Sequence, residues 1–159
     1  MTHDLVVIIG AQYLFIVVPA VALIYWIVAP AVTKRYLVVV GIATGVVSVL
    51  IGQIIAHFYF DVRPFMTGHF PPLIPHAPDN GFPSDHTLLS SIIAATITPA
   101  NVRLGIVLWI IAALVGVARV SAGLHHPIDV VGSICIAAAI GAVIHWIFRG
   151  RRERVWPRS

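Results

Sequence analysis

Long apolar stretches separated by short polar segments run through this chain. Residues 5–29 and 36–60 are almost continuously apolar, and Pro30, Lys34 and Arg35 lie between them. About 20 consecutive apolar residues allow a helix to cross the hydrocarbon core of a bilayer. We therefore predict one membrane-spanning helix in each stretch. No Lys or Arg precedes the first stretch, which is also longer than a signal-peptide core, so we expect it to stay in the mature protein.

The pattern resumes after one long loop, residues 61–85, whose six prolines exclude a regular helix. Three further apolar stretches follow, at residues 84–99, 102–120 and 127–148. As a helix, the first of these would be only about 22 to 24 Å long, shorter than the ~30 Å hydrocarbon core. Its polar start, with Ser84 or Asp85 as the N-cap, is therefore expected at or just below the membrane surface.

The composition excludes a soluble domain of this length. Of the 159 residues, 59% are hydrophobic and 10% are charged. The chain is predicted to be one integral membrane domain, residues 1–159, with an all-α fold of about five transmembrane helices and one long extracytoplasmic loop. The net charge of +4 does not indicate a nucleic-acid partner, because the basic residues lie at helix ends and in the tail without interleaved aromatic residues.

The basic residues also predict an orientation. When five helices are threaded in order, one side of the membrane receives eight of the basic side chains: Lys34, Arg35, Arg103, Arg149, Arg151, Arg152, Arg154 and Arg158. The positive-inside rule makes that side cytoplasmic, together with the basic tail of residues 149–159. Arg63 and Arg119 fall on the outer side, and the same threading places His86, His125 and Asp129 there.

The polar segment from Arg119 to Asp129 contains the most informative chemistry. Polar groups between two membrane spans are costly unless they have a function. If a helix restarts near Pro127, Asp129 lies on its first turn and can hydrogen-bond one nitrogen of His125. The other nitrogen then keeps its lone pair, as a nucleophile or a base requires. The guanidinium of Arg119 suits the oxygens of a phosphoryl group.

Two further segments complete a known pattern. Arg63-Pro64, Pro83-Ser84-Asp85-His86, and Arg119 with His125 and Asp129 occur in this order, and together they resemble the type 2 phosphatidic acid phosphatase superfamily. Three positions depart from the family pattern: Ala56 replaces a lysine, Ala118 a serine and Asp85 a glycine. Gln53 and His57, one helical turn apart, are candidates to compensate for the lysine. Pro-Ser-Asp-His with Arg-Pro-Phe before it resembles the bacterial undecaprenyl-diphosphate phosphatase branch.

The resemblance implies a mechanism without a metal or another cofactor. His125 would attack the terminal phosphorus and form a phosphohistidine, while Asp129 fixes its tautomer. His86 would protonate the leaving oxygen and later activate water. Three side chains would bind phosphate oxygens: Arg63, Arg119 and Ser84. Asp85 is an accessory residue that would cap the helix, orient His86 or Arg63, or deter a more negative head group.

The expected substrate is a lipid, because the phosphate site would lie at the outer membrane surface among apolar helices. The resemblance implies a polyprenyl (undecaprenyl) diphosphate, recycled as the carrier lipid of cell-wall synthesis at the bacterial inner membrane. Phosphatidylglycerophosphate, phosphatidate and lipid A are alternative substrates of the same chemistry.

Two hypotheses of other classes remain open. The first is a catalytically silent lipid-phosphate binding or transport module, which Ala56 favours. The second is a membrane metal-binding protein with ligands at His86, His125, His126 and Asp129, although the two arginines would repel a cation. Gly and Ala faces in the last two helices would permit close contacts in an oligomer.

Overall fold

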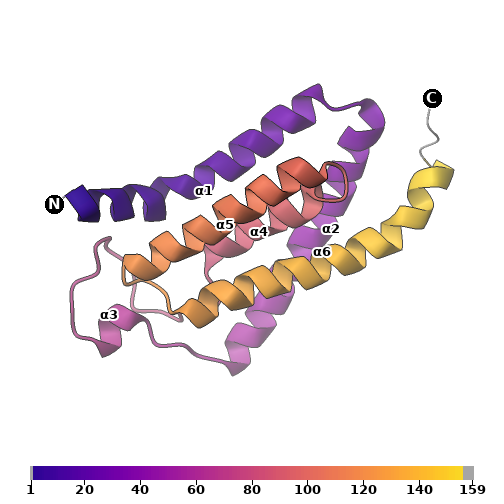
Figure 1. Ribbon diagram of the computed structural model, residues 1–159. Helices are drawn as coiled ribbons and strands as arrows, with labels where there is room; N and C mark the ends of the chain where they lie inside the picture. Colours follow the sequence, from indigo (N-terminus) through magenta and orange to yellow (C-terminus); the bar gives the residue numbers. More distant parts are fainter. Residues whose placement is uncertain (1, 156–159) are drawn as a thin grey trace.

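Helices are the regular elements in the part of the chain that the structure describes, and one long loop connects two of them. The structure is a computed structural model that describes residues 2–155, except for the side chains of residue 3 and residues 150–155. Its helices are α1 (Thr2–Val28), α2 (Ala31–Phe58), α3 (Pro64–Thr67), α4 (Asp85–Ile97), α5 (Val102–Ser121) and α6 (Pro127–Val155) (Figure 1). This arrangement confirms the predicted all-α membrane bundle. Four helices are long and apolar enough to cross a membrane: α1, α2, α5 and α6.

Helices α2 and α6 extend beyond their predicted boundaries. Helix α2 begins at Ala31 instead of residue 36, so Lys34 and Arg35 lie in its first turns. Long basic side chains can reach water from a helix end, which explains why they do not break the helix. Helix α6 continues past the predicted end at residue 148 as far as Val155. Arg and Glu favour helix, so the basic segment extends the span. Residues 156–159 of the predicted tail lie outside the described residues.

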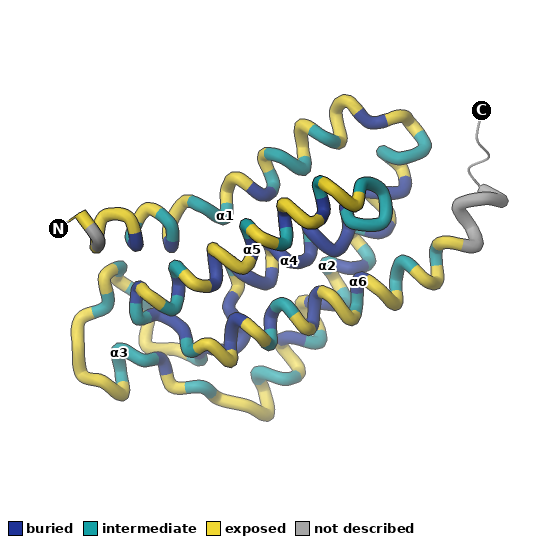
Figure 2. Tube along the Cα trace, viewed as in Figure 1, coloured by how far each residue is buried: buried dark blue, intermediate teal, exposed yellow. Residues whose placement is uncertain are grey.

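Helix α4 forms the centre of the bundle although it is too short to cross a membrane alone. It packs against α1, α2, α5 and α6, and most of its length is buried (Figure 2). Small side chains let the neighbouring helices approach closely. A Cβ added at Gly141 of α6 would lie only 2.6 Å from the Cβ of Ala95. The surrounding helices therefore fix where the first residues of α4 lie.

The start of α4 is held differently from the prediction. Ser84 occupies the N-cap position, but its side chain makes no capping hydrogen bond. Its hydroxyl instead lies 3.0 Å from the hydroxyl of Thr87. The Ser84 amide donates to the Ser133 hydroxyl of α6 at 3.0 Å. Asp85 is exposed on the first turn. The helix start is thus tied to α6 instead of being capped by Ser84 or Asp85.

The two ends of the bundle carry different connections. The loop that contains α3 and the turn between α5 and α6 lie at one end, whereas the α1–α2 turn and the end of α6 lie at the other (Figure 1). The single helical turn α3 was not predicted, and it begins at Pro64, a residue suited to the first position of a helix. Arg63, directly before it, therefore reaches the same end of the bundle as His125.

Candidate active site

The three predicted motif segments converge at the end of the bundle that carries α3. Arg63 Nη1 donates to the carbonyl of Leu124 at 2.9 Å and lies 3.4 Å from His125 Nε2. His86 of α4 lies within electrostatic range of both Arg119 and His125. The Asp85 carboxylate in turn acts on Arg119. Residues up to 66 positions apart in sequence, from Arg63 to Asp129, therefore share one site.

The surroundings of His125 determine which of its nitrogens carries the proton. The side chain is 2% exposed. Its Nδ1 faces two acceptors, the Gly81 carbonyl at 2.8 Å and Asp129 Oδ2 at 3.4 Å. Both partners accept only, so Nδ1 carries the hydrogen and donates it. The lone pair is then on Nε2, the nitrogen that faces Arg63. This is the tautomer that a nucleophile needs.

Asp129 contributes to this arrangement less directly than the spacing predicted. The nearest acceptor of His125 Nδ1 is the Gly81 carbonyl, and Asp129 lies 0.6 Å farther away (3.4 minus 2.8 Å). Asp129 Oδ2 accepts a hydrogen bond from the backbone amide of His126 at 2.9 Å, which stabilises the first turn of α6. Its Oδ1 is buried and has no partner among the described residues. Asp129 therefore positions the turn as well as the imidazole.

Arg63 is held by several protein groups. Its Nε donates to Asp79 Oδ1 at 2.7 Å, and its Nη2 donates to the Asn80 carbonyl at 3.2 Å. Together with the bond from Nη1 to the Leu124 carbonyl, these bonds give every nitrogen of the guanidinium a protein partner. The side chain is only 5% exposed. Hydrogen-bonded acceptors make the burial of a charge tolerable. The guanidinium is therefore preformed beside His125.

Asn80 connects this loop to the end of α2, which the sequence analysis did not predict. Its Nδ2 donates to the carbonyls of Ala56 and Tyr59 at 3.1 and 3.0 Å. Its Oδ1 accepts from the amides of Asp61 and Phe82 at 2.9 and 3.0 Å. Asn-Gly is a turn signal in sequence, but it does not reveal these partners. Asn80 thereby fixes both Arg63 and the neighbouring Gly81 carbonyl.

Arg119 is buried with far fewer partners than Arg63. Its side chain is 4% exposed, and its Nη1 donates to the Ala11 carbonyl at a long 3.4 Å. Its Nε is buried without a partner among the described residues. An unpaired buried donor on a charged group is costly. The donors of this guanidinium are therefore less completely satisfied than those of Arg63.

His86 and Ser84 occupy the start of α4 on the same side. His86 is half-buried and packs edge-to-face against Phe15 of α1, with ring centroids 4.3 Å apart. Ser84 is fully buried, and its hydroxyl is engaged with Thr87. The phosphate-binding role expected of Ser84 would require that hydroxyl to donate to a ligand while it accepts from Thr87.

Gln53 and His57, the candidates to compensate for the family lysine, lie outside the buried face of α2. Both side chains are exposed on α2. The buried face of this helix runs through Thr44, Ser48 and Gly52, and the two residues lie one position beyond that row. At the position of the family lysine, the Ala56 carbonyl accepts a hydrogen bond from Asn80.

The long loop brings another histidine to the site. The ring centroid of His76 lies 6.5 Å from that of His125, at an interplanar angle of 75°. Its Nδ1 is 3.9 Å from the carboxylate oxygen of Asp79 that binds Arg63. Burial, followed by the charges of Arg63 and Arg119, holds the pKa of His76 below its ordinary value. The position of His76 beside His125 was not predicted, because His76 lies in the loop outside the three motif segments.

One group of side chains could hold a metal ion among the described residues, and it differs from the predicted ligand set. Ligand atoms of Asp61, His126 and Asp129 lie within 4.8 Å of one another. His86 and His125 do not belong to this group. Asp61 Oδ2 and His126 Nδ1 are already paired at 2.7 Å. A metal would have to replace that ion pair.

Comparisons with known proteins agree with this geometry. A family model described as the PAP2 superfamily matches residues 33–153. The undecaprenyl-diphosphatase BcrC of Bacillus subtilis (strain 168) is 33% identical over 138 residues, which cover 87% of this chain and 71% of that protein. A putative undecaprenyl-diphosphatase, YbjG of Escherichia coli (strain K12), is 29% identical over 146 residues, covering 89% of this chain and 73% of that protein.

A solved structure shows the same fold. It is the crystal structure of a transmembrane PAP2 type phosphatidylglycerolphosphate phosphatase from Bacillus subtilis, with a TM-score of 0.53 and 18% sequence identity. The match covers 98% of this chain and 87% of that one. At this identity the likeness concerns the arrangement of the helices alone.

Proposed function

The chain belongs to the PAP2 superfamily, and we propose on this premise that it is a membrane lipid phosphatase that removes the terminal phosphate of a polyprenyl diphosphate. The observation that carries the proposal is His125 in its Nδ1-protonated form with the buried Arg63 3.4 Å from its Nε2, together with a second buried arginine, Arg119, that acts on the neighbouring His86. Two guanidinium groups can neutralise a phosphoryl group, and a free imidazole nitrogen can attack it. The names of the relatives in Bacillus subtilis and Escherichia coli favour undecaprenyl diphosphate as the lipid.

The proposed reaction proceeds in two steps. His125 Nε2 attacks the terminal phosphorus, so an N–P bond forms while the bond to the bridging oxygen breaks. His86 gives its proton to that oxygen, and the lipid monophosphate leaves. His86 then takes a proton from water, whose oxygen attacks the phosphohistidine and releases inorganic phosphate. Arg63 and Arg119, with Ser84, stabilise the equatorial oxygens in both steps.

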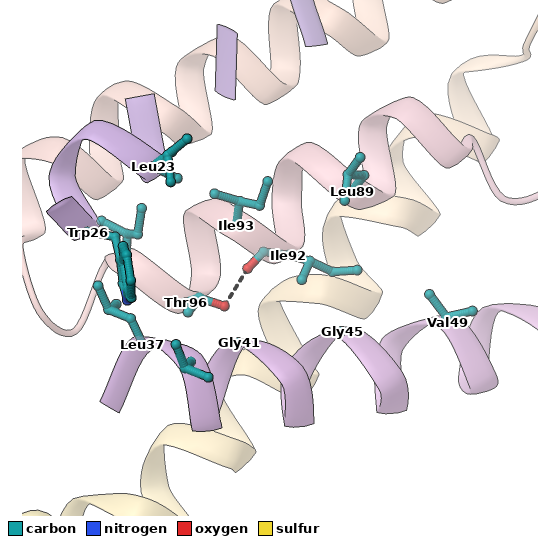
Figure 3. A pocket seen from close by; sticks show the side chains of 13 residues that line it. Leu23, Trp26, Leu37, Gly41, Gly45, Val49, Leu89, Ile92, Ile93 and Thr96 are labelled. Atoms are coloured by element: carbon teal, nitrogen blue, oxygen red, sulfur yellow. Dashed lines mark hydrogen bonds between the residues drawn. The ribbon is translucent and has the colours of Figure 1, made fainter. Parts of the chain in front are cut away.

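An apolar groove supports a lipid substrate. It has a volume of about 610 Å³ and lies between α1, α2 and α4 (Figure 3). It begins at Leu89, one helical turn after His86, and extends to Trp26 and Leu37. The hydroxyl of Thr96, inside the groove, is bonded to the Ile92 carbonyl at 2.8 Å and so presents no free donor. Such a surface suits a hydrocarbon chain whose head group lies at the site.

The proposed location is the bacterial inner membrane, with the site on the extracytoplasmic side. The first turns of α2, which contain Lys34 and Arg35, and the C-terminal end of α6 lie at the bundle end opposite to α3 (Figure 1). The positive-inside rule makes that end cytoplasmic, together with the C-terminal segment. In this orientation the enzyme would dephosphorylate a carrier lipid released by cell-wall synthesis and return it for reuse. Apolar faces of α5 and α6 would allow an oligomer.

A substrate panel tests the proposal. Purified protein in detergent would be incubated with undecaprenyl diphosphate, phosphatidylglycerophosphate, phosphatidate and lipid A, and phosphate release would be measured for each. We expect the highest kcat/KM for undecaprenyl diphosphate. A preference for phosphatidylglycerophosphate, phosphatidate or lipid A would reassign the substrate, and no release from any of the four would refute the proposal.

The same assay tests the proposed independence from metal. We expect full activity after treatment with a chelator, because the arginines supply the electrostatic stabilisation. Activity that is lost with chelator and restored by a divalent ion would contradict this expectation. The expected ligands of that ion would then be Asp61, His126 and Asp129, the one group of described residues able to bind a metal.

A further inference from the structure

We propose that His76 is a specificity-determining residue that binds the second phosphate of a diphosphate substrate. The inference rests on the proposed function, because it concerns the same site. It assigns a role to a loop histidine that lies outside the three motif segments. It also explains why the loop folds back over the motif residues.

The position of His76 is set by the residues that hold Arg63. Asp79 Oδ1 accepts from Arg63 Nε at 2.7 Å and lies 3.9 Å from His76 Nδ1. One carboxylate therefore connects the loop histidine to a phosphate-binding arginine. The His76 ring also approaches the ring of His125, with a centroid separation of 6.5 Å. A group bound at His125 would thus have His76 within reach of its next phosphate.

The hydrogen bonds of His76 favour Nε2 as the nitrogen that binds a ligand. Its Nδ1 faces the Ala77 carbonyl at 3.3 Å and the Asp79 carboxylate at 3.9 Å, both of which accept only. Nδ1 therefore carries a hydrogen. The side chain is 25% exposed, so an incoming ligand can reach it while the loop holds it in place. Protonated at Nε2, the imidazolium would donate a charge-assisted hydrogen bond to a phosphate oxygen.

The surrounding charges explain why a diphosphate in particular would use this residue. Arg63 and Arg119 act on His76 as positive charges, and Asp79 acts as a negative one. His86 also lies within electrostatic range of His76. Without a ligand, the arginines disfavour the imidazolium. A terminal phosphate already carries about −1.5 to −2 at neutral pH. A second phosphate adds negative charge beside His76 and favours its protonated form.

The experiment compares two histidines of the same loop. His76→Asn keeps a donor near the position of Nδ1 and removes Nε2. His69→Asn is the matched control, because His69 is exposed and its backbone φ of 51° is one that Asn tolerates. The value of kcat/KM would be measured for farnesyl diphosphate and farnesyl monophosphate with each variant. The ratio of the two values reports recognition of the second phosphate.

We expect His76→Asn to lower this ratio on the order of tenfold, since one charge-assisted hydrogen bond is lost. His69→Asn should leave the ratio within about twofold of the wild-type value. His76→Lys, which restores a cation, should recover most of the preference. Competitive inhibition provides a second measurement: His76→Asn should weaken inhibition by inorganic diphosphate more than inhibition by orthophosphate.

The outcomes separate this inference from the proposed function. If the wild-type protein releases phosphate from neither farnesyl substrate nor the lipid panel, the proposed function fails. If the wild type is active and His76→Asn lowers both kcat/KM values equally, His76 has only a structural role and the inference is wrong. The inference is also wrong if His69→Asn shifts the ratio as much, or if His76→Lys fails to restore it.

Discussion

The two arginines of the candidate site are equally buried but held in opposite ways. Arg63 is 5% exposed and Arg119 is 4% exposed. The guanidinium of Arg63 donates to Asp79, Asn80 and Leu124. Within the described part of the chain, that of Arg119 makes one long bond to Ala11 and its Nε has no partner. A buried cation without acceptors is unfavourable, so the Arg119 side of the site costs stability until an anion binds.

The difference in hydrogen bonding indicates that the two arginines have different functions in the site. Arg63, Asn80 and the Gly81 carbonyl form what we call the Arg63 side of the site. Their hydrogen bonds are made without substrate, and they set the geometry of His125. Arg119 and His86 form the Arg119 side, where the guanidinium has few hydrogen-bond partners among the described residues. A bound phosphate would supply the acceptors that Arg119 lacks. The comparison therefore predicts that changes on the Arg63 side alter both stability and turnover, whereas changes on the Arg119 side alter mainly turnover.

The largest effect is expected from His125→Ala, which removes the group that both sides serve. Without the nucleophile, turnover of the lipid diphosphate should fall by at least about 10³-fold. Phosphate release by the purified variant measures this. The affinity for lipid, measured by competition, should change far less. If turnover falls only modestly, His125 is not the nucleophile and a silent lipid-binding module becomes the better account.

Paired lysine substitutions test the contrast between the two arginines directly. Arg63→Lys and Arg119→Lys should each lower kcat/KM by about 10²- to 10³-fold, because a lysine cannot bind two oxygens of one phosphate in the same plane. Arg63→Lys should also lower the free energy of unfolding by about 2–3 kcal/mol through lost buried hydrogen bonds. Arg119→Lys should change it by less than ~1 kcal/mol. Thermal unfolding in detergent would measure both variants.

A reversed order of stabilities would break the comparison. If Arg119→Lys destabilised the protein more than Arg63→Lys, the apparent lack of partners at Arg119 would not describe the folded protein. Adding orthophosphate sharpens the test further. It should raise the unfolding temperature of the wild type more than that of Arg119→Lys, because the anion completes the unpaired guanidinium.

Asn80→Ala tests whether the Arg63 side sets the geometry of catalysis. The substitution removes four hydrogen bonds, two to carbonyls at the end of α2 and two from amides of the loop itself. We expect kcat to fall on the order of tenfold, because misplacement of Arg63 and the Gly81 carbonyl disturbs His125. Asn101→Ala is the control, since Asn101 caps α5 at the opposite end by accepting from the Leu104 amide. Both variants should lose some stability, and only Asn80→Ala should lose kcat.

The smallest expected effect concerns the acid dependence of the Asp79–Arg63 pair. Burial opposes ionisation of Asp79, but the hydrogen bond and charge of Arg63 prevail and hold its pKa below the ordinary 3.8. A lowered pKa in the folded state stabilises the protein above pH 3.8, and this contribution disappears as the pH falls through the folded pKa. Asp79 is 60% exposed, so the contribution should not exceed about 1 kcal/mol.

Thermal unfolding of Asp79→Asn between pH 3 and pH 6 checks this prediction. The wild type should be more stable than the variant at pH 6, and the difference should shrink towards pH 3. A difference that stays constant over this range would show that the ionised carboxylate does not stabilise the loop. The wild type should also keep the higher kcat at pH 6, because Asp79 orients Arg63.

The sequence was sufficient to predict those features that depend on local pattern. The apolar stretches predicted about five transmembrane helices, of which four, α1, α2, α5 and α6, are long and apolar enough to cross a membrane. The motif segments pointed to Arg63, His86, Arg119 and His125. The roles assigned to these residues remain predictions. The segment of α4 was counted as the fifth transmembrane helix, although its residue count already made it shorter than the hydrocarbon core.

Features that depend on the path of the long loop could not be predicted. Asn80 and His76 owe their positions to contacts with α2 and Arg63, and no periodicity signals such contacts. The hydrogen bond from His125 to the Gly81 carbonyl was missed for the same reason, and the spacing pointed to Asp129 instead. The exposure of Gln53 and His57 could not be predicted either, because the rotation of α2 about its axis is set by packing against α4 and α6.

Trapping the covalent intermediate tests the central claim most directly. The wild-type protein would be mixed with a lipid diphosphate labelled at its terminal phosphate, quenched within the first turnover under alkaline conditions, and mapped by mass spectrometry. The account predicts a labelled phosphate on His125 that is absent from His125→Ala and accumulates in His86→Ala, which cannot activate water. A label on Ser84 or on another residue, with His125 unmodified, would contradict it.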